Sequence, residues 1–550
     1  MRQRVPRRGR VRRPPCGTRD HRTGSRHDNR LRSTERALLD SRLHLHEVGA
    51  CMSRNELPND LLDLDSDEFR RRGRDVMEWI TNYLESTRDY PVLSRSQPGD
   101  LSEALPPSGP ETPVAWEELL RDLDEKIIPA MTHWNHPRFF AYFANTGSAA
   151  GILGAALATA LNSNGMLWRT SPAATELETR VTRWLAEWLG LGDMPFGIIN
   201  DTASTSSLVA LAAAREAVPA YDRQQGMRSV GVLRIYASEQ AHSSVDKAAA
   251  ILGMGLDAVR RIDTRADFSL DPAALQKAID EDRAAGVTPV CIVATTGTTS
   301  TTSIDPVAEI AEIAQRESVW LHVDAAYGGA AAIVPRLRER FRGWETADSV
   351  VVNPHKWLFT PMCCSVLYSN RPAMLQEAFS LVPEYLRSDV GDDRGGLDAP
   401  VDYMNYGVQL GRPFRALTLW MVLSSYGRQV MSTLVDNHVC WVEELAALID
   451  ADPDFERLAP TPLSTVCFRY HPGVGPTEDG SSLSEVDGDP WADLNEQLMG
   501  AVNAEGTTFL SHTRLRGRLS LRLAVGNLRT TREDLHTAWE QVRGAAVRVS

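Results

Sequence analysis

Short apolar runs alternate with helical patterns between residues 195 and 370, and this alternation limits the folds open to the chain. The helical patterns show apolar residues every three or four positions. Apolar runs of this length, separated by helices, are typical of a mostly parallel sheet covered by helices on both faces. We therefore predict an α/β fold. The runs are 233–236, 290–294, 319–323, 350–352 and 364–368.

The rest of the chain divides around this region. We predict an N-terminal helical segment over 56–150, a large domain over 151–415 and a smaller C-terminal α+β domain over 416–550. The last of these begins with a long helical pattern over 414–448. It then alternates short strands at 466–470 and 519–524 with a final helix from Thr531.

The first 51 residues differ in composition from the rest. They hold 14 arginines and five acidic residues, a net charge of +9, whereas the whole chain of 550 residues carries −13. An arginine-rich arm for nucleic acid is one interpretation. A signal peptide is disfavoured because no apolar segment follows the basic start. We expect residues 1–55 to be a disordered basic extension, or, with Met52 as the true start, a stretch that is not translated. An acidic body binds nucleic acid poorly, which weakens the interpretation as an arm.

The composition points to a cytoplasmic protein without a membrane segment. Seven cysteines are scattered without the CxxC spacing of a zinc site, which fits a reducing compartment. The longest apolar stretch, 147–161, is too short and too rich in glycine and alanine to span a bilayer. We predict no metal site, no membrane partner and no nucleic-acid partner.

Polar residues follow four of the apolar runs directly. In an open α/β sheet, ligands bind beyond the carboxyl ends of the strands, so these residues are the candidates for a site. Together they supply a carboxylate, a lysine, two histidines and several hydroxyls to one edge. They lie at 237–242, 295–299, 324–327 and 353–357.

Only four of the 59 basic residues are lysines, and only Lys356 closely follows a buried strand. A desolvated lysine has a lowered pKa and can act as a nucleophilic amine. Asp324 ends a neighbouring strand, where a buried carboxylate needs a cation. Either Lys356 is that cation, or the lysine and the carboxylate hold pyridoxal phosphate, whose ring nitrogen is cationic. The other lysines, in solvated helical patterns, are Lys126, Lys247 and Lys277.

A phosphate needs its own cradle, and residues 201–207 offer one. This run, DTASTSS, opens a helix with hydroxyls and free backbone N–H groups, which bind anions. Serine and threonine clusters also cap helices without binding anything, so the run alone is a weak signal. His242, at the end of another strand, either stacks on a cofactor ring or is a structural histidine.

Five motifs together resemble group II pyridoxal-phosphate-dependent amino-acid decarboxylases, especially the aromatic-L-amino-acid decarboxylases. The likeness runs in order from about residue 56 to 545. It implies a fold-type I, aspartate-aminotransferase-like architecture, a role in amino-acid metabolism and a homodimer with its site at the subunit interface. The motifs are HPRFFAYF at 136–143, SPAATELE at 171–178, QAHSS at 240–244, HVDAAY at 322–327 and NPHKW at 353–357.

The resemblance also implies roles for single residues. Lys356 would be the Schiff-base lysine, and Asp324 would hold the pyridine nitrogen. His242 would stack on one ring face and could handle protons, while Ala326 would pack on the other face. Tyr385 matches a loop tyrosine that protonates the substrate carbon after carbon dioxide leaves. Further cofactor-binding residues, most of them near the phosphate, would be Ala203, Ser204, Thr299, Asn353 and His355.

The implied substrate pocket departs from the aromatic pattern at several positions. Asn145 replaces a threonine, and Asn164 and Met166 replace an aliphatic and an aromatic residue. We expect decarboxylation of an aromatic L-amino acid. An acidic or diamino-acid decarboxylase, or an aldehyde synthase on the same fold, remains as an alternative. The implied pocket residues are Trp134, Tyr142, Phe143, Asn145, Asn164 and Met166.

A conservative substitution tests the expected role of Tyr385. Phenylalanine cannot donate a proton, and the resembling aldehyde synthases carry phenylalanine at this loop position. We therefore expect Tyr385→Phe to keep cofactor binding and carbon dioxide release while its product shifts from amine toward aldehyde, with ammonia and peroxide. Amine, aldehyde and peroxide are measured in one reaction mixture. A variant that makes only amine at the parent rate would show that Tyr385 is not the donor.

Overall fold

The computed structural model describes residues 63–192, 194, 196–381, 400–475 and 488–550. Tyr385 and the expected basic extension lie outside these residues. The chain divides into two compact units, Met1–Trp79 and Ile80–Ser550. Helix α2 (Ser66–Glu85) begins in the first unit, and all the elements that follow lie in the second.

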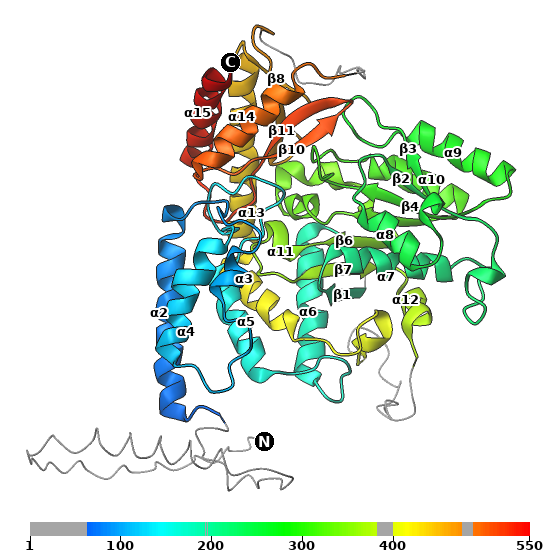
Figure 1. Cartoon of the computed structure of the whole chain (residues 1–550). Coiled ribbons are helices and arrows are strands. Elements are labelled where there is room, and N and C mark those ends of the chain that lie inside the picture. The colour runs from blue at the N-terminus through cyan, green and yellow to red at the C-terminus, as the bar shows by residue number, and fades with distance from the viewer. Residues whose placement is uncertain (1–62, 193, 195, 382–399, 476–487) are drawn as a thin grey trace, which may run out of the picture. The chain divides into compact units, whose positions relative to one another are not determined.

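A seven-stranded sheet forms the centre of the second unit (Figure 1). Its strand order is β1-β7-β6-β5-β4-β2-β3. Neighbouring strands from β3 to β6 run parallel, while β7 runs antiparallel to both β1 and β6. The strands are β1 (Phe196–Asn200), β2 (Leu233–Ser238), β3 (Val259–Ile262), β4 (Thr288–Thr295), β5 (Trp320–Asp324), β6 (Ser349–Val352) and β7 (Ser365–Ser369).

The expected mostly parallel sheet with helices on both faces is confirmed. Along β4, Ile292 and Ala294 pack on one face with α6, α9, α10 and α13. Val293 packs on the opposite face with α7, α8 and α12. Both faces are apolar, as burial on both sides requires. The helices are α6 (Pro172–Leu189), α7 (Ala203–Glu216), α8 (Ser244–Ile251), α9 (Pro272–Ala284), α10 (Val307–Glu317), α11 (Pro354–Trp357), α12 (Pro372–Phe379) and α13 (Arg415–Ala451).

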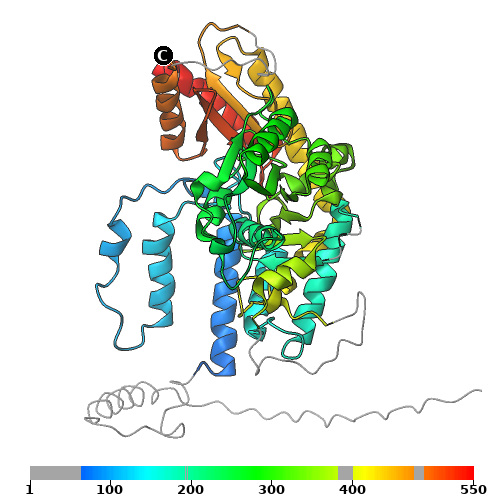
Figure 2. The same cartoon turned by 90° about the vertical axis from the view of Figure 1, so that its right-hand side faces the viewer.

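A smaller antiparallel sheet of order β10-β11-β9-β8 follows α13 (Figure 2). Helices α14 and α15 pack against it and bury residues such as Leu498 and Trp539. Thr531 caps the last helix in a capping box with Asp534, as the sequence predicts for a helix from Thr531. The elements are β8 (Phe455–Arg457), β9 (Thr465–Tyr470), α14 (Ala492–Glu505), β10 (Ser511–Leu515), β11 (Arg518–Ala524) and α15 (Arg532–Val549).

The segments before the large sheet are mostly helical. Helix α5 is made entirely of apolar residues and threonine, and it packs along α13. A π-helical turn, Leu123–Ile127, continues α4. Within the part of the chain that is described, no helix has the length and apolar character needed to cross a bilayer. The helices are α3 (Asp100–Ala104), α4 (Trp116–Asp122) and α5 (Ala149–Leu161).

Two strands of the large sheet are not evident from the sequence pattern. Strand β3 is an edge strand, and Arg260 and Arg261 at its centre form ion pairs with Glu281 and Asp246. Charged residues are common on exposed edges and hide the apolar signal. Strand β1 lies at the other edge and is only five residues long.

Candidate active site

The carboxyl ends of β4, β5 and β6 are joined by backbone hydrogen bonds, which bring the predicted polar residues to one edge. Thr296 donates its N–H to the carbonyl of Asp324, at 2.9 Å. Asn353 donates to the carbonyl of Ala326, at 3.2 Å. Because all three strands run parallel, the side chains that follow them share this edge.

Lys356 lies in the short helix α11, just after β6. Its Nζ lies 5.4 Å from the centroid of the Phe143 ring. Burial of the amine lowers the pKa of Lys356, the charge of Asp324 opposes this, and the charge of Arg522 adds to it. An amine with a lowered pKa is more often neutral and nucleophilic. The other lysines differ: Lys126 and Lys277 form helix-surface ion pairs, and Lys247 is exposed.

Asp324 ends β5 and is only 6% exposed. One carboxylate oxygen accepts the N–H of Ala326 at 3.1 Å. Among the residues that the structure describes, no basic side chain lies within ion-pair distance of this carboxylate. Asp324 and Lys356 therefore make no direct ion pair in the described part of the chain, although the charge of Asp324 still acts to raise the pKa of Lys356. A cationic group from outside the chain would satisfy the carboxylate.

The two histidines at this edge have fixed rings. His242, in the loop before α8, is exposed, and its Nδ1 accepts the N–H of Ser244 at 3.1 Å. This bond leaves Nε2 free to carry a hydrogen. His355 is buried, and its Nδ1 accepts the N–H of Cys364 at 2.9 Å. Burial lowers the pKa of His355 to about 4, so this ring is neutral near pH 7.

The start of α7 and the loop after β4 provide groups that suit a phosphate. Ala203 and Ser204 form the first turn of α7, and Thr202 before them makes no side-chain cap. Their N–H groups are therefore available to an anion. Thr299 is exposed on the loop after β4. The Oδ1 atom of Asn353 is buried without a hydrogen-bond partner, and Ala326 beside it is 7% exposed.

Aromatic rings gather around Trp134 and around Tyr142, the residue before Phe143. The Trp134 ring stacks on Phe139 at 4.4 Å and lies 6.1 Å from Tyr142, which meets the edge of Phe509. Trp134 and Tyr142 stay 38% and 55% exposed, so this group faces solvent as well as the protein. Asn145 contacts the sulfur of Met362 at 3.9 Å. Phe509 was not among the predicted residues, because its sequence neighbours show no motif.

Asn164 and Met166 lie on a different segment, after α5. Asn164 accepts the N–H of Arg412 at 2.9 Å, and the Met166 carbonyl accepts the N–H of Met404. The Arg412 guanidinium forms a buried ion pair with Glu178 at 2.6 Å. Within the described ranges, no hydrogen bond or ring contact joins Asn164 or Met166 to the Lys356 edge. In the single chain, their hydrogen-bond contacts are instead with Arg412 and Met404.

Arg522, near the end of β11, was not predicted but reaches the site. Its guanidinium lies over the Phe143 ring, 4.5 Å from the centroid. Its Nε donates to the carbonyl of Ser300 at 3.0 Å, while Nη2 is buried without a partner. Burial lowers the pKa of Arg522. An arginine inside the apolar strand 519–524 is the signal that could have revealed it.

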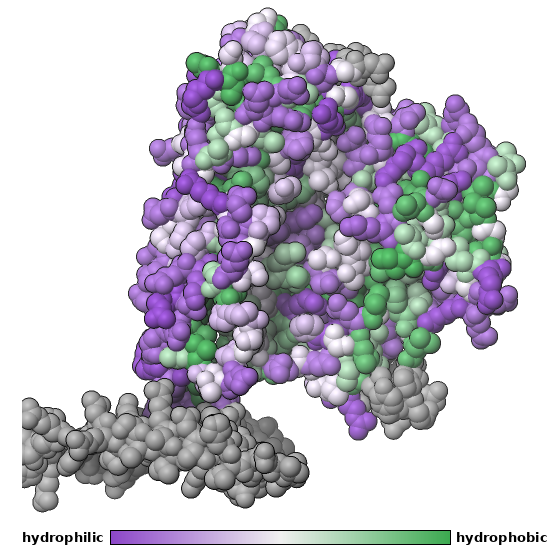
Figure 3. Space-filling model, in the orientation of Figure 1, coloured by the Kyte–Doolittle hydropathy of each residue, from purple (hydrophilic) through white to green (hydrophobic). Residues whose placement is uncertain are grey.

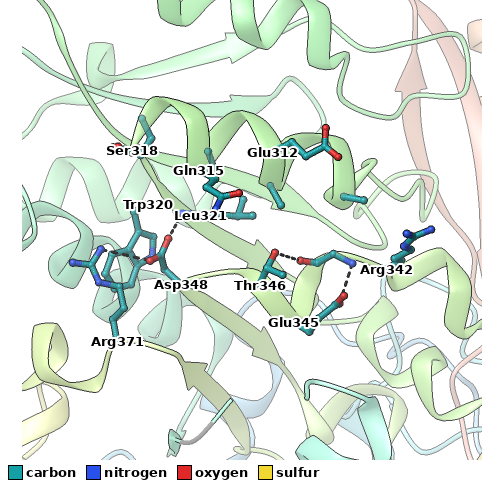
Figure 4. A pocket seen from close by; sticks show the side chains of 15 residues that line it. Glu312, Gln315, Ser318, Trp320, Leu321, Arg342, Glu345, Thr346, Asp348 and Arg371 are labelled. Atoms are coloured by element: carbon teal, nitrogen blue, oxygen red, sulfur yellow. Dashed lines mark hydrogen bonds and ion pairs between the residues drawn. The ribbon is translucent and has the colours of Figure 1, made fainter. Parts of the chain in front are cut away.

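A hollow of about 540 Å³ is lined by other residues (Figure 4). Its lining includes Trp320, the first residue of β5, and Asp348, just before β6. It therefore lies at the amino ends of the strands. Asp348 is already engaged by the N–H of Leu321 and by Arg371. None of the predicted site residues lines this hollow, so it is not the candidate site.

Known proteins resemble this chain over most of its length. Residues 98–471 match the pyridoxal-dependent decarboxylase conserved domain. Tryptophan decarboxylase 2 of Oryza sativa is 37% identical over 89% of this chain and 96% of its own length. Phenylacetaldehyde synthase of Arabidopsis thaliana is also 37% identical, over 88% and 97%. The Catharanthus roseus tryptophan decarboxylase structure, with L-tryptophan, matches at TM-score 0.79 and 34% identity over 88% and 99%.

The chain belongs to the pyridoxal-dependent decarboxylase family. It is a carboxy-lyase with the fold-type I architecture expected from the sequence. The family cofactor, pyridoxal phosphate, fits the groups at this edge. The carboxylate of Asp324 lacks a cation, Lys356 is the lysine nearby, and the start of α7 offers free N–H groups. The unpartnered Oδ1 of Asn353 is a further polar atom that a ligand or its water could satisfy.

Asp324→Asn tests whether this carboxylate faces a cationic ring nitrogen. An amide has nearly the same shape but no charge, so it no longer favours the protonated ring. We expect roughly 10²–10³-fold lower kcat, with some cofactor still bound. Turnover and the visible absorbance of the bound cofactor are measured on the same preparation. Near-normal turnover would rule out the assignment.

Proposed function

We propose that this decarboxylase acts on an aromatic L-amino acid, of the tryptophan, tyrosine, phenylalanine or Dopa type, and releases its amine and carbon dioxide. The Phe143 ring beside Lys356 is the observation that carries the proposal, since its centroid lies 5.4 Å from Nζ. Phe143 is itself covered by Tyr327 and Arg522, so the exposed rings of the residues near it in the chain, Trp134 and Tyr142, would receive an aromatic side chain. The relatives named as tryptophan and tyrosine decarboxylases support it.

The residues at the strand ends divide the work of holding the cofactor. Lys356 would attach it covalently, Asp324 would pair with its ring nitrogen, and His242 and Ala326 would cover the two ring faces. His242, with its free Nε2, would hold a proton for the reaction. When bound, pyridoxal phosphate withdraws electrons from the reacting carbon as carbon dioxide leaves. The residues that would hold the phosphate are Ala203, Ser204, Thr299, Asn353 and His355.

Arg522 supplies a cation for the carboxylate of the substrate. Its unpartnered Nη2 is buried, and the guanidinium lies over Phe143 on the Lys356 side of the molecule. A carboxylate beside it gains a charge-assisted hydrogen bond, which fixes the orientation of the bond to be broken. The aromatic group then receives the other end of the substrate.

Two alternatives have specific support. Asn145 and Asn164 make the implied pocket more polar, which favours a decarboxylase of an acidic or diamino acid. A relative named as a phenylacetaldehyde synthase favours the oxidative reaction on the same fold. Tyr385 argues for amine formation, because it matches the tyrosine of the amine-forming enzymes.

A screen of amine formation over the twenty amino acids and Dopa distinguishes these functions. We expect kcat/KM to be highest for one or more aromatic amino acids, with at least tenfold lower values for glutamate and 2,4-diaminobutyrate. Amine and carbon dioxide are to be equal in amount. Preference for glutamate or 2,4-diaminobutyrate contradicts the aromatic proposal, and excess aldehyde over amine identifies a synthase.

We further propose a cytoplasmic homodimer whose interface includes α5. Leu153, Leu157 and Leu161 lie four residues apart on this helix and are 45%, 50% and 62% exposed. An apolar stripe of this kind is costly in water unless a partner covers it. Asn164 and Met166 follow the stripe directly, so in a dimer they would face the partner's site. The proposed domain division stays near residue 415, where α13 begins.

Leu157→Arg tests this interface. A buried charge without a partner destabilises an interface, so we expect the molar mass to fall from twice 60.8 kDa to that of one chain, with a loss of activity. Light scattering after gel filtration measures the mass. Ile251→Arg is the control, because Ile251 is 69% exposed on α8, a helix that Figure 1 shows apart from α5. Figure 3 shows apolar side chains on the face of the molecule where Figure 1 draws α8. A dimeric Leu157→Arg variant, or a monomeric parent enzyme, contradicts the proposal.

A further inference from the structure

Three aromatic rings form a continuous stack beside Lys356. Phe143 lies 3.6 Å from Tyr327, and Tyr327 lies 4.8 Å from Trp357, with interplanar angles of 15° and 2°. Trp357 in turn donates its indole N–H to Nδ1 of His438 at 2.9 Å. The Tyr327 ring thus lies between Phe143, which faces Lys356, and Trp357, which follows Lys356 in sequence.

The hydroxyl of Tyr327 contacts residues of the C-terminal region, beside the smaller sheet. It donates to the carbonyl of Val525 at 3.0 Å and lies 2.6 Å from Oγ of Ser464. Since a phenol has one hydrogen, Ser464 donates to it in return. Burial raises the pKa of Tyr327, so the phenol keeps its proton. The N–H of Val525 donates to the carbonyl of Ser464, which closes the group.

Two glycines lie where the ends of β5 and β11 approach each other closely. Gly526, next to Val525, has no side chain, and a Cβ there would lie 3.3 Å from the Tyr327 oxygen. Gly328, next to Tyr327, sits so close to the loop after β4 that a Cβ would lie 2.3 Å from the carbonyl of Thr296. The end of β5 and the end of β11 are therefore in direct contact.

These contacts fix where Arg522 lies relative to Lys356. Arg522 precedes Val525 by three residues in the same region of chain, and its guanidinium rests on Phe143, the ring stacked on Tyr327. Lys356 faces that same Phe143 ring. A shift of β11 along the sheet edge would move the guanidinium and leave the lysine in place.

We propose that Tyr327 is a positioning residue whose hydroxyl holds β11 against the end of β5, so that Arg522 meets the substrate carboxylate while Lys356 holds the cofactor. The inference rests on the proposed function of Arg522. The ring of Tyr327 packs the stack, and the hydroxyl sets the register between the two sheets. Ser464 and the carbonyl of Val525 complete this connection.

Tyr327→Phe separates the role of the ring from that of the hydroxyl, because it keeps the ring and removes the hydroxyl. Two competitive inhibitors of the holoenzyme report the effect: a 3-arylpropanoate, which has the carboxylate but no amine, and the arylethylamine product, which has no carboxylate. We expect the inhibition constant of the arylpropanoate to rise about tenfold, since a lost hydrogen bond to a positioned group is of this order. That of the arylethylamine is expected to change less than twofold.

A second readout does not depend on turnover. Hydrogen exchange of the β11 amides in the holoenzyme is expected to become faster in Tyr327→Phe and in Ser464→Ala. The double variant is expected to show little more than either single change, because both remove the same connection. Tyr368→Phe is the matched control: its buried hydroxyl donates to the carbonyl of Thr182 at 2.9 Å, away from this site. It is expected to lower the melting temperature without changing either inhibition constant.

The outcomes separate this inference from the proposed function. Equal changes of both inhibition constants, or unchanged β11 exchange in a folded Tyr327→Phe, overturn the positioning role. Arg522→Met tests the carboxylate site itself: if its arylpropanoate affinity equals that of the parent, the role of Arg522 is wrong, and the exchange measurement alone decides whether Tyr327 holds β11. A parent enzyme that binds neither inhibitor contradicts the aromatic proposal in the same way.

Discussion

The free-energy cost of burying charged groups governs the structure around the candidate site. Asp324 is buried at the end of β5 without an ion pair, and Lys356 loses basicity through burial at the end of β6. The chain brings them to the same edge but does not pair them. An unpaired buried carboxylate costs several kcal/mol unless something neutralises it. In the proposed site the cofactor would supply the missing cation, which would couple its binding to the stability of this edge.

The parallel sheet and the residues at its strand ends could be predicted from the sequence because both follow from local patterns. Apolar runs revealed β2, β4, β5, β6 and β7, and parallel pairing then required that Asp324 and Lys356 meet at one edge. The edge strands β1 and β3 were missed. In β3, exposure admits Arg260 and Arg261. In the buried strand β1, close packing against Thr182 requires Gly197, which interrupts the apolar pattern.

Residues that act through distant contacts could not be predicted in this way. Arg522 lies over 160 residues after Lys356, and only the packing of β11 against the large sheet places it over Phe143. The opposite case is Asn164, which sequence analysis placed in the pocket. In the single chain its side chain binds the backbone of Arg412. In the proposed dimer it would face the pocket of the second chain.

The reversed direction of β7 keeps the connection between β6 and β7 at the site edge. Because β6 runs toward the site edge and β7 runs away from it, the whole connection over residues 353–364 stays at that edge and never crosses the sheet. Its first part carries Asn353, His355 and Lys356, while Met362, near its end, is exposed and touches Asn145. Substitutions at the exposed residues Met362 and Cys363 would therefore change the surroundings of Asn145 while the register of the strands stays intact. For divergence among enzymes on this scaffold, and for loop grafting in the laboratory, this connection between β6 and β7 is the natural place to begin.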